Sequence, residues 1–124
     1  MILVDTSVWV HHLRFGNPQI AALLDANSVL MHPFVVGELA CGSLAKRAAT
    51  LELPQQLPMA PVAESDEVLG YIETHKLHGK GIGYVDVHLL ASATIGDALL
   101  WTRDRRLHTV AVVLERAFHD AGAH

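Results

Sequence analysis

The chain alternates between short, wholly apolar runs and longer segments in which apolar residues recur at helical spacing. Residues 2–4 contain no polar position, which predicts a strand buried on both faces. Further strands are predicted at residues 28–32, 59–63 and 98–102. Because the strands alternate with helices, we predict an α/β fold with a central parallel sheet of four to five strands flanked by helices.

The helical segments have recognisable starts and ends. Helices are predicted at residues 7–14, 18–27, 33–51, 65–77 and 84–95, and over most of 105–120. Thr6 or Ser7 is expected to cap the first of them, because hydroxyl oxygens accept hydrogen bonds from the first helical turn. Residues 53–58 are predicted to be a connector, and the glycine-rich residues 78–83 a flexible surface loop.

Composition limits the kind of protein this is. The 124 residues are 51% hydrophobic and 18% charged, which is typical of one globular domain, expected here to span residues 1–124. Cys41 is the only cysteine, so no disulfide can form within the chain. With no signal-peptide pattern at its start, the chain is expected in the cytoplasm, and no apolar run is long enough to span a membrane.

Several kinds of functional site can be set aside. Residues 79–83 lack the Gly-Lys-Ser/Thr ending of a phosphate-binding P-loop, and they follow a helix where a dinucleotide motif would follow a strand. His75 and His78 could share a helix face, but no cysteine or acid completes a zinc site. Ser7 has no histidine–acid partner pattern, so a capping role is favoured over that of a nucleophile.

Four acidic residues stand apart from the other nine, which resemble solvated helix faces. Asp5 ends the first predicted strand, and Glu38 is embedded in an apolar run after the second. Asp86 lies in the first turn of an apolar helix, and Asp104 two residues past the strand at 98–102. Positions just after the strands of a parallel sheet share one edge, where α/β proteins bind ligands. We therefore expect these four carboxylates to converge.

Converging carboxylates repel one another unless a cation is present. Hard oxygen ligands select Mg²⁺ or Mn²⁺, so the pattern predicts a divalent metal site. An alternative reading is that helix dipoles favour each acid separately. That reading fits Asp86 and Asp104, but it does not explain Glu38 in an apolar run or Asp5 at a strand end.

The order and spacing of these segments resemble a known family. The motifs are ILVDTS at residues 2–7, GEL at 37–39, VD at 85–86 and LWTRD at 100–104. Together they resemble the PIN-domain ribonucleases, in particular the VapC-type toxins of bacterial and archaeal toxin–antitoxin modules. The resemblance covers essentially the whole chain. One departure is Leu107, where the family often has an aromatic residue, and it bears on packing more than on chemistry.

The resemblance implies a function and a set of site residues. It implies a metal-dependent endoribonuclease with Mg²⁺ or Mn²⁺ held by Asp5, Glu38, Asp86 and Asp104, of which Asp5 and Asp86 are the expected direct ligands. Ser7 and Thr102 would be supporting hydroxyls. The resemblance also implies an RNA substrate, a VapB-like protein antitoxin and a homodimer.

Basic residues flank the last acid of this set. Arg103, Arg105 and Arg106 surround Asp104, and Lys80 lies on the glycine-rich loop. They could contact RNA phosphates, or they could form an ordinary solvated charge run, and the sequence leaves both readings open. Single-stranded or looped RNA is the expected target, because unstacked RNA exposes its backbone.

Two other functional classes stay open. A Mg²⁺-binding phospho-acceptor receiver domain has similar length and layering. However, a sequence that resembles that class has a pair of adjacent acids after the first strand and a lysine after the last strand. Here Asp5 is followed by Thr6, and Thr102 by Arg103. A phosphatase of the Asp-x-Asp type fails because Ser7 replaces the second acid. The second class is a catalytically silent PIN-fold binding module, which the presence of all four acids argues against.

Overall fold

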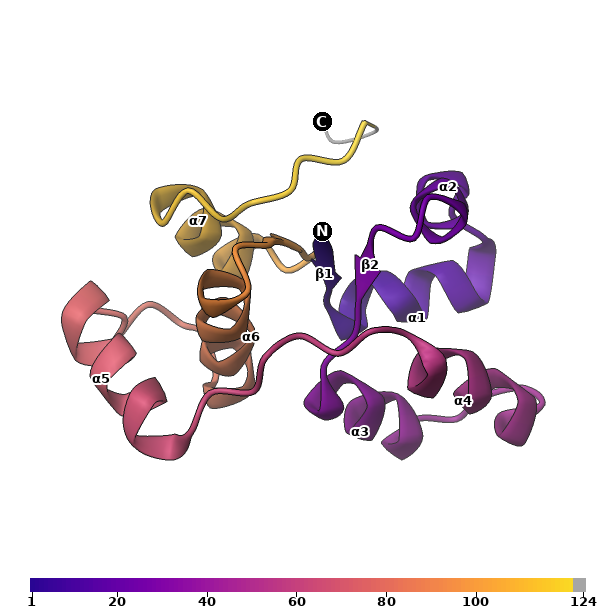
Figure 1. Ribbon diagram of the computed structural model, residues 1–124, viewed down its shortest axis with the longest axis horizontal. Coiled ribbons are helices and arrows are strands. Elements are labelled where there is room, and N and C mark those ends of the chain that lie inside the picture. The colour runs from indigo at the N-terminus through magenta and orange to yellow at the C-terminus, as the bar shows by residue number, and fades with distance from the viewer. Residues whose placement is uncertain (122–124) are drawn as a thin grey trace.

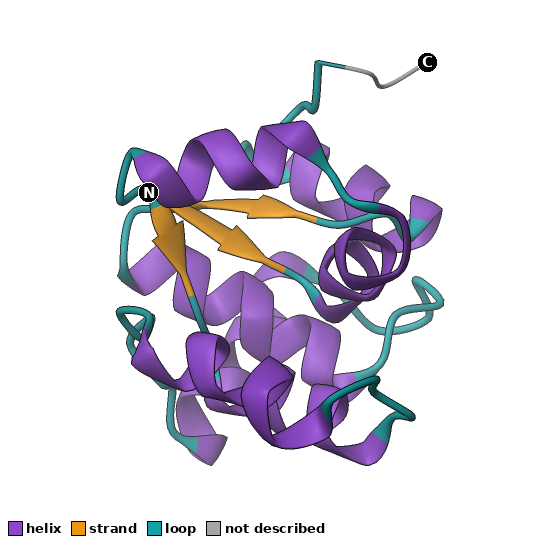
Figure 2. Ribbon diagram, turned by 90° about the vertical axis from the view of Figure 1, so that its right-hand side faces the viewer, coloured by secondary structure: helices purple, strands orange, loops and turns teal. Residues whose placement is uncertain are grey.

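A short parallel sheet lies at the centre of the computed structural model, which describes residues 1–121. Its strands are β1 (Ile2–Val4), β2 (Val29–Leu30) and β3 (Leu99–Trp101), in the order β2-β1-β3. Leu3 pairs with Leu30 on one side and with Leu100 on the other. Figure 2 shows the three strands fanning out side by side from the end at which the N-terminus lies. Their carboxyl ends therefore share one edge.

The number of strands differs from the prediction of four to five. Within residues 1–121 the sheet has three strands, and only single bridges extend it, from Met31 to Met59 and from Leu100 to Ala117. At the first edge, pairing is limited to the bonds that Met31 makes with the carbonyl of Pro58 and the N–H of Ala60, so the strand expected at residues 59–63 is reduced to this bridge. The predicted α/β class and the parallel arrangement are confirmed.

Helices cover both sides of this sheet. They are α1 (Thr6–Phe15), α2 (Pro18–Asp25), α3 (Pro33–Cys41), α4 (Arg47–Gln56), α5 (Ser65–His75), α6 (Tyr84–Ile95) and α7 (Arg105–Val113). Figure 1 shows α1 and α2 on one side of β1 and β2, and α6 on the other. α6 packs against β3 and α5 packs on α6, whereas α1 contacts α3. In the part of the chain that the structure describes, no helix is long and apolar enough to cross a membrane.

The prediction of a single helix over residues 33–51 is wrong, because the structure has two helices there. The chain leaves the helix at Gly42 and re-enters one after Lys46, whose φ of +48° breaks the helical path. The guanidinium of Arg47 then donates to the carbonyl oxygens of Ala40 and Gly42, which satisfies groups that the end of α3 exposes. α4 continues through Pro54, so most of the predicted connector at 53–58 is also helical.

The helix predicted over most of 105–120 ends earlier than expected. α7 stops at Val113, and Glu115 adopts the left-handed conformation with φ +59°. That turn sends the chain back to the sheet, where Leu100 donates to the carbonyl of Arg116 and accepts from the N–H of Phe118. A left-handed glutamate is uncommon, so the local sequence gives little sign of this turn. That residues 1–124 form one domain stays a prediction, and residues 122–124 lie outside the described part.

The core forms where the apolar runs meet. The three residues of β1 are buried, and Leu3 and Val4 have no exposed surface. Seven consecutive residues of α6, 87 to 93, are buried, so the middle of this helix is enclosed on all sides rather than amphipathic. Truncating Leu3 to alanine would cost about 2–5 kcal/mol, which is typical of a buried leucine. This core holds the strand ends, and the side chains that follow them, in fixed positions.

Candidate active site at the carboxyl edge of the sheet

Asp5 is the most enclosed of the four acids, with 6% of its surface exposed. It follows β1 directly, and its Oδ1 accepts a 2.7 Å hydrogen bond from the N–H of Thr6. Asp5 is therefore the N-cap of α1, and the expectation that Thr6 or Ser7 would be the cap is wrong. Aspartate at this position completes the first helical turn as well as serine does, which frees both hydroxyls for other contacts.

Two hydroxyl groups fix the other oxygen of Asp5. Oδ2 accepts from Thr102 Oγ1 at 2.7 Å and from Ser7 Oγ at 2.9 Å. The same hydroxyls accept from the backbone beyond β3, Thr102 from the N–H of Asp104 and Ser7 from that of Arg103, both at 3.0 Å. The network therefore joins the end of β1 to the loop that carries Asp104.

Glu38 reaches the site from α3 and is held by Thr6, which the sequence suggested only as a helix cap. The hydroxyl of Thr6 donates to Oε1 of Glu38 at 2.6 Å. The contact joins residues 32 positions apart in the sequence, so only the folded arrangement brings them together. The one available signal was that Thr6 lies between Asp5 and Ser7, which both belong to the network.

Asp86 is half-buried in the first turn of α6. Burial raises its pKa most, and the negative charges of Asp5, Asp104 and Glu38 raise the pKa further. The N–H of Gly83 donates to Oδ2 at 3.0 Å, which acts in the opposite direction. The charges of the other three acids all act on this carboxyl in the same direction, and the convergence of the four carboxylates on one metal site stays a prediction.

The alternative reading, separate acids at helix starts, also describes part of the structure. Asp104 is the N-cap of α7, and its Oδ1 accepts from the N–H of Leu107 at 2.9 Å. Asp86 lies in the first turn of α6 and bonds back to Gly83. Each of these two caps engages one carboxylate oxygen, so the capping role leaves a second oxygen for another ligand. The two readings are therefore compatible at Asp86 and Asp104.

The donor set suits a hard divalent cation. The side chains of the hydrogen-bond network offer carboxylate or hydroxyl oxygen, and no ion pair within residues 1–121 involves any of the four acids. As the side chains stand, no three His, Cys, Asp or Glu among the described residues form a group arranged to hold a metal ion. The chemistry of the donors fits Mg²⁺ or Mn²⁺, and their present arrangement is not a closed ligand shell.

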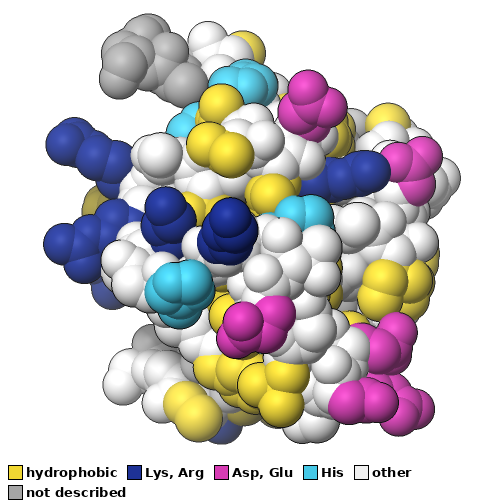
Figure 3. All heavy atoms as spheres, turned by 90° about the vertical axis from the view of Figure 1, so that its left-hand side faces the viewer, with side chains coloured by type: hydrophobic (Ala, Val, Ile, Leu, Met, Phe, Trp, Pro, Cys, Tyr) yellow, Lys and Arg dark blue, Asp and Glu magenta, His cyan; other side chains and the backbone are white. Residues whose placement is uncertain are grey.

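The four basic residues make no ion pair with the four acids within residues 1–121. Arg103, Arg105, Arg106 and Lys80 are all exposed. Gly81 has φ +78°, and a Cβ atom there would lie 2.8 Å from Cδ of Arg106, so the Arg106 side chain rests on the glycine-rich loop that carries Lys80. Figure 3 shows Lys and Arg side chains extending from one edge of the face formed by α5, α6 and α7 to its middle.

Comparison with known proteins identifies the family of this chain. The sequence pattern of the PIN domain matches residues 2–113. The chain belongs to the PIN domain family. Within it, the chain is 47% identical over 108 residues to Ribonuclease VapC32 of Mycobacterium tuberculosis, in both strain CDC 1551 / Oshkosh and strain ATCC 25618 / H37Rv. That match covers 86% of this chain and 87% of the relative, and the predicted VapC-type resemblance is confirmed.

A solved structure supports the PIN fold independently. A chain in the crystal structure of FitAcB from Neisseria gonorrhoeae superposes with a TM-score of 0.66, and the superposition covers 97% of both chains. Its sequence is 24% identical to this PIN-domain chain, so the likeness concerns the fold alone.

Proposed function

We propose that this PIN-domain protein is a Mg²⁺- or Mn²⁺-dependent endoribonuclease and the toxin of a VapBC-type toxin–antitoxin module. The observation that carries the proposal is the hydrogen-bond network at the carboxyl ends of the strands, which links Asp5 to Glu38 through Thr6 and to Asp104 through Thr102. Four acids that make no ion pair within residues 1–121, at the ligand-binding edge of a parallel sheet, favour a cationic cofactor over a structural role. The similarity to Ribonuclease VapC32 supports the reaction class.

Asp5 and Asp86 would be the direct metal ligands, with Glu38 and Asp104 completing the anionic site. A bound divalent ion supplies an activated water, orients the scissile phosphate and stabilises the leaving oxygen. The chain holds the acids in place: Thr102, Ser7 and the N–H of Thr6 fix both oxygens of Asp5, and Thr6 Oγ1 fixes Glu38. These contacts orient the carboxylates of Asp5 and Glu38 before a cation binds, which favours catalysis by preorganisation.

An acidic protein also needs a way to hold an anionic substrate. Arg103, Arg105, Arg106 and Lys80 are exposed, and Arg106 already rests on the loop that leads to Gly83 and Asp86. We propose that these side chains bind phosphates on either side of the cleaved bond in single-stranded or looped RNA. The acids and their cation then act on the phosphate between them.

We also propose that the protein is cytoplasmic, forms a homodimer and is bound by a VapB-like antitoxin. A groove of about 490 Å³ runs between α1 and the end of α3. Exposed Val10 and Leu13 line it together with Arg14, and Glu38 lies at its wall. Such a groove suits an amphipathic peptide that carries a basic residue toward the acids, which supports an inhibitory protein partner.

One experiment tests the enzyme proposal. Purified protein should cleave single-stranded RNA when Mg²⁺ or Mn²⁺ is present and stop when EDTA is added, and Asp5→Asn should be inactive under all conditions. Cleavage that survives EDTA would exclude the metal-dependent mechanism. Lack of cleavage by wild type on a broad RNA pool would favour the silent binding module. Labelling of the protein by acetyl phosphate in the same preparation would support the receiver alternative, against which the family membership argues.

A further inference from the structure

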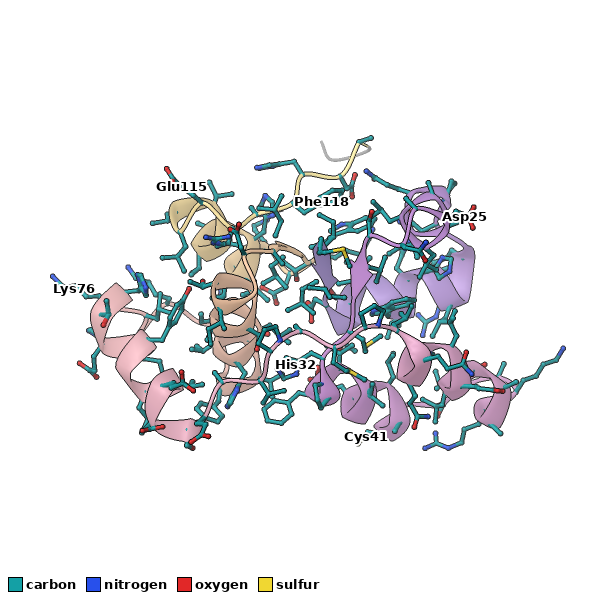
Figure 4. The ribbon with its side chains drawn as sticks, viewed as in Figure 1. Asp25, His32, Cys41, Lys76, Glu115 and Phe118 are labelled. Carbon is teal, nitrogen blue, oxygen red and sulfur yellow. The ribbon has the colours of Figure 1, made fainter. Side chains whose placement is uncertain are left out.

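His32 occupies an unusual position for a histidine, at the junction where β2 leads into α3. Its side chain has no exposed surface, and it is the N-cap of α3. Figure 4 shows it in the middle of the molecule, between α3 and α6. Buried polar side chains require partners, so both ring nitrogens must be accounted for.

Both ring nitrogens of His32 have partners, and the partners fix its tautomer. Nδ1 accepts a 3.0 Å hydrogen bond from the N–H of Phe34, so it cannot carry a proton. The proton is therefore on Nε2, which lies 3.1 Å from Oγ of Ser92 and donates to it. Burial, followed by the nearby charge of His88, lowers the pKa of His32 to about 4, so the ring stays neutral at pH 7.

The His32–Ser92 bond connects α3 to α6, the two helices that carry Glu38 and Asp86. His32 caps α3, whose second turn carries Glu38. Ser92 is fully buried in α6, whose first turn carries Asp86. Thr6 holds Glu38 from the β1 side, and Gly83 holds Asp86 from its loop, but neither contact joins α3 to α6 directly.

We propose that His32 and Ser92 are a positioning pair, whose hydrogen bond holds α3 against α6 so that Glu38 and Asp86 can act on the same divalent cation. This inference rests on the proposed metal-dependent function. Neither side chain touches the cation or the substrate. Their effect is on the separation of two helices, and it should therefore appear in the affinity for metal rather than only in stability.

A second hydroxyl on α6 provides a matched control. Thr94 Oγ1 lies 2.9 Å from the hydroxyl of Tyr71, and this contact joins α6 to α5. α5 carries none of the four acids. Removing the Tyr71–Thr94 bond loosens α6 against a different neighbour, with no direct effect on the Glu38–Asp86 separation.

The experiment measures Mn²⁺ binding by calorimetry and metal-free thermal unfolding for four variants of the full chain. Ser92→Ala removes the acceptor, and His32→Asn keeps a capping oxygen for Phe34 but is too short to reach α6. Both should raise the Mn²⁺ dissociation constant by about 3- to 30-fold. The double variant should bind Mn²⁺ no more weakly than the weaker-binding single variant, because both substitutions break the same hydrogen bond. Tyr71→Phe should leave the dissociation constant within about twofold of wild type.

Two results would overturn the inference. One is an unchanged Mn²⁺ dissociation constant in both Ser92→Ala and His32→Asn. The other is an equal loss of affinity in Tyr71→Phe, which would mean that any loosening of α6 has the same effect. A wild-type protein that binds no Mn²⁺ would instead refute the proposed function itself, and the inference with it.

Discussion

The hydroxyl of Thr102 donates a 2.7 Å hydrogen bond to Oδ2 of Asp5, joining the ends of two neighbouring parallel strands that are 97 positions apart in the sequence. The hydroxyl oxygen of Thr102 also accepts from the N–H of Asp104 at 3.0 Å. One hydroxyl therefore places two acids of the site relative to each other. Since Thr102 and Asp5 are both buried, the contact is also part of the core.

Replacing Thr102 with valine should harm both stability and activity. Valine keeps the shape of the side chain but leaves the N–H of Asp104 without its acceptor and Asp5 with one donor fewer. We expect a loss of about 1–3 kcal/mol in the free energy of unfolding, and much weaker RNA cleavage. Denaturant unfolding and a cleavage assay measure the two effects. Thr109→Val removes an exposed hydroxyl bond on α7 and should change stability by no more than about 0.5 kcal/mol.

Replacing Asp86 with asparagine should abolish cleavage and stabilise the metal-free protein at pH 7. Because burial and three acids raise the pKa of Asp86 above 3.8, the native state holds more protons than the unfolded chain. Its contribution to stability is present at low pH and is lost as pH rises through the folded-state pKa. We expect Asp86→Asn to gain about 0.5–1 kcal/mol at pH 7, with the gain shrinking toward zero below about pH 4.

The same variant should lose most of the stabilisation that Mg²⁺ gives the wild type, which reaches about 2.7 kcal/mol at a hundredfold excess over the dissociation constant. Thermal unfolding with and without Mg²⁺ measures this difference. Glu73→Gln, at an exposed position on α5, is the charge-matched control and should keep the full Mg²⁺ effect. A metal-free Asp86→Asn that is less stable than wild type at pH 7 would contradict the convergence of the four acids.

His32 should make the protein sensitive to mild acid. The folded state keeps the ring neutral with a pKa of about 4, against 6.5 for an ordinary histidine, so the unfolded chain binds a proton first as pH falls. The contribution to stability is complete above about pH 6.5 and decreases toward pH 4. Between pH 7 and pH 4.5, wild type should lose about 2–3 kcal/mol more than His32→Asn. The measurement is urea unfolding of both proteins at pH 7 and pH 4.5. An equal loss of unfolding free energy in wild type and His32→Asn would exclude this role for His32.

The proposed RNA contacts predict a change in salt dependence. Neutralising Arg105 and Arg106 together to glutamine should weaken RNA binding, and should flatten the plot of log affinity against log salt by about 0.7 for each phosphate that is no longer bound. Fluorescence anisotropy of the inactive Asp5→Asn background with labelled RNA measures it. The control is the double variant with Lys46→Gln and Lys76→Gln, which removes the same amount of positive charge at other positions. If both double variants flatten the slope equally, the effect is one of net charge and not of local phosphate binding.

The sequence was most informative where the signal was local. A buried apolar run followed by a carboxylate marks a strand end, which is why Asp5 and Asp104 could be assigned to the edge of a parallel sheet. The bounds of α6 were predicted to the residue, because Gly83 and Gly96 flank an apolar segment of helical length.

The features that were missed depend on contacts between distant segments. Nothing near Thr6 indicates that its hydroxyl will meet Glu38, and nothing near His32 indicates Ser92, because each pairing exists only once the helices are packed. The ends of α3 and α7 were misjudged for a related reason. Lys46 and Glu115 adopt left-handed conformations that favour glycine, and the surrounding fold compensates for the cost.

The single bridges at the two edges of the sheet restrict how another protein can bind. Met31 already donates to the carbonyl of Pro58 and accepts from the N–H of Ala60, and Leu100 is paired in the same way with residues 116 and 118. Exposed strand edges invite pairing with a further chain, and here a neighbouring segment occupies each outer strand. A partner peptide would find few unpaired backbone groups to join as an added strand. Recognition is left to side chains on the helices, so exchanging a few surface residues could change the partner without altering the sheet.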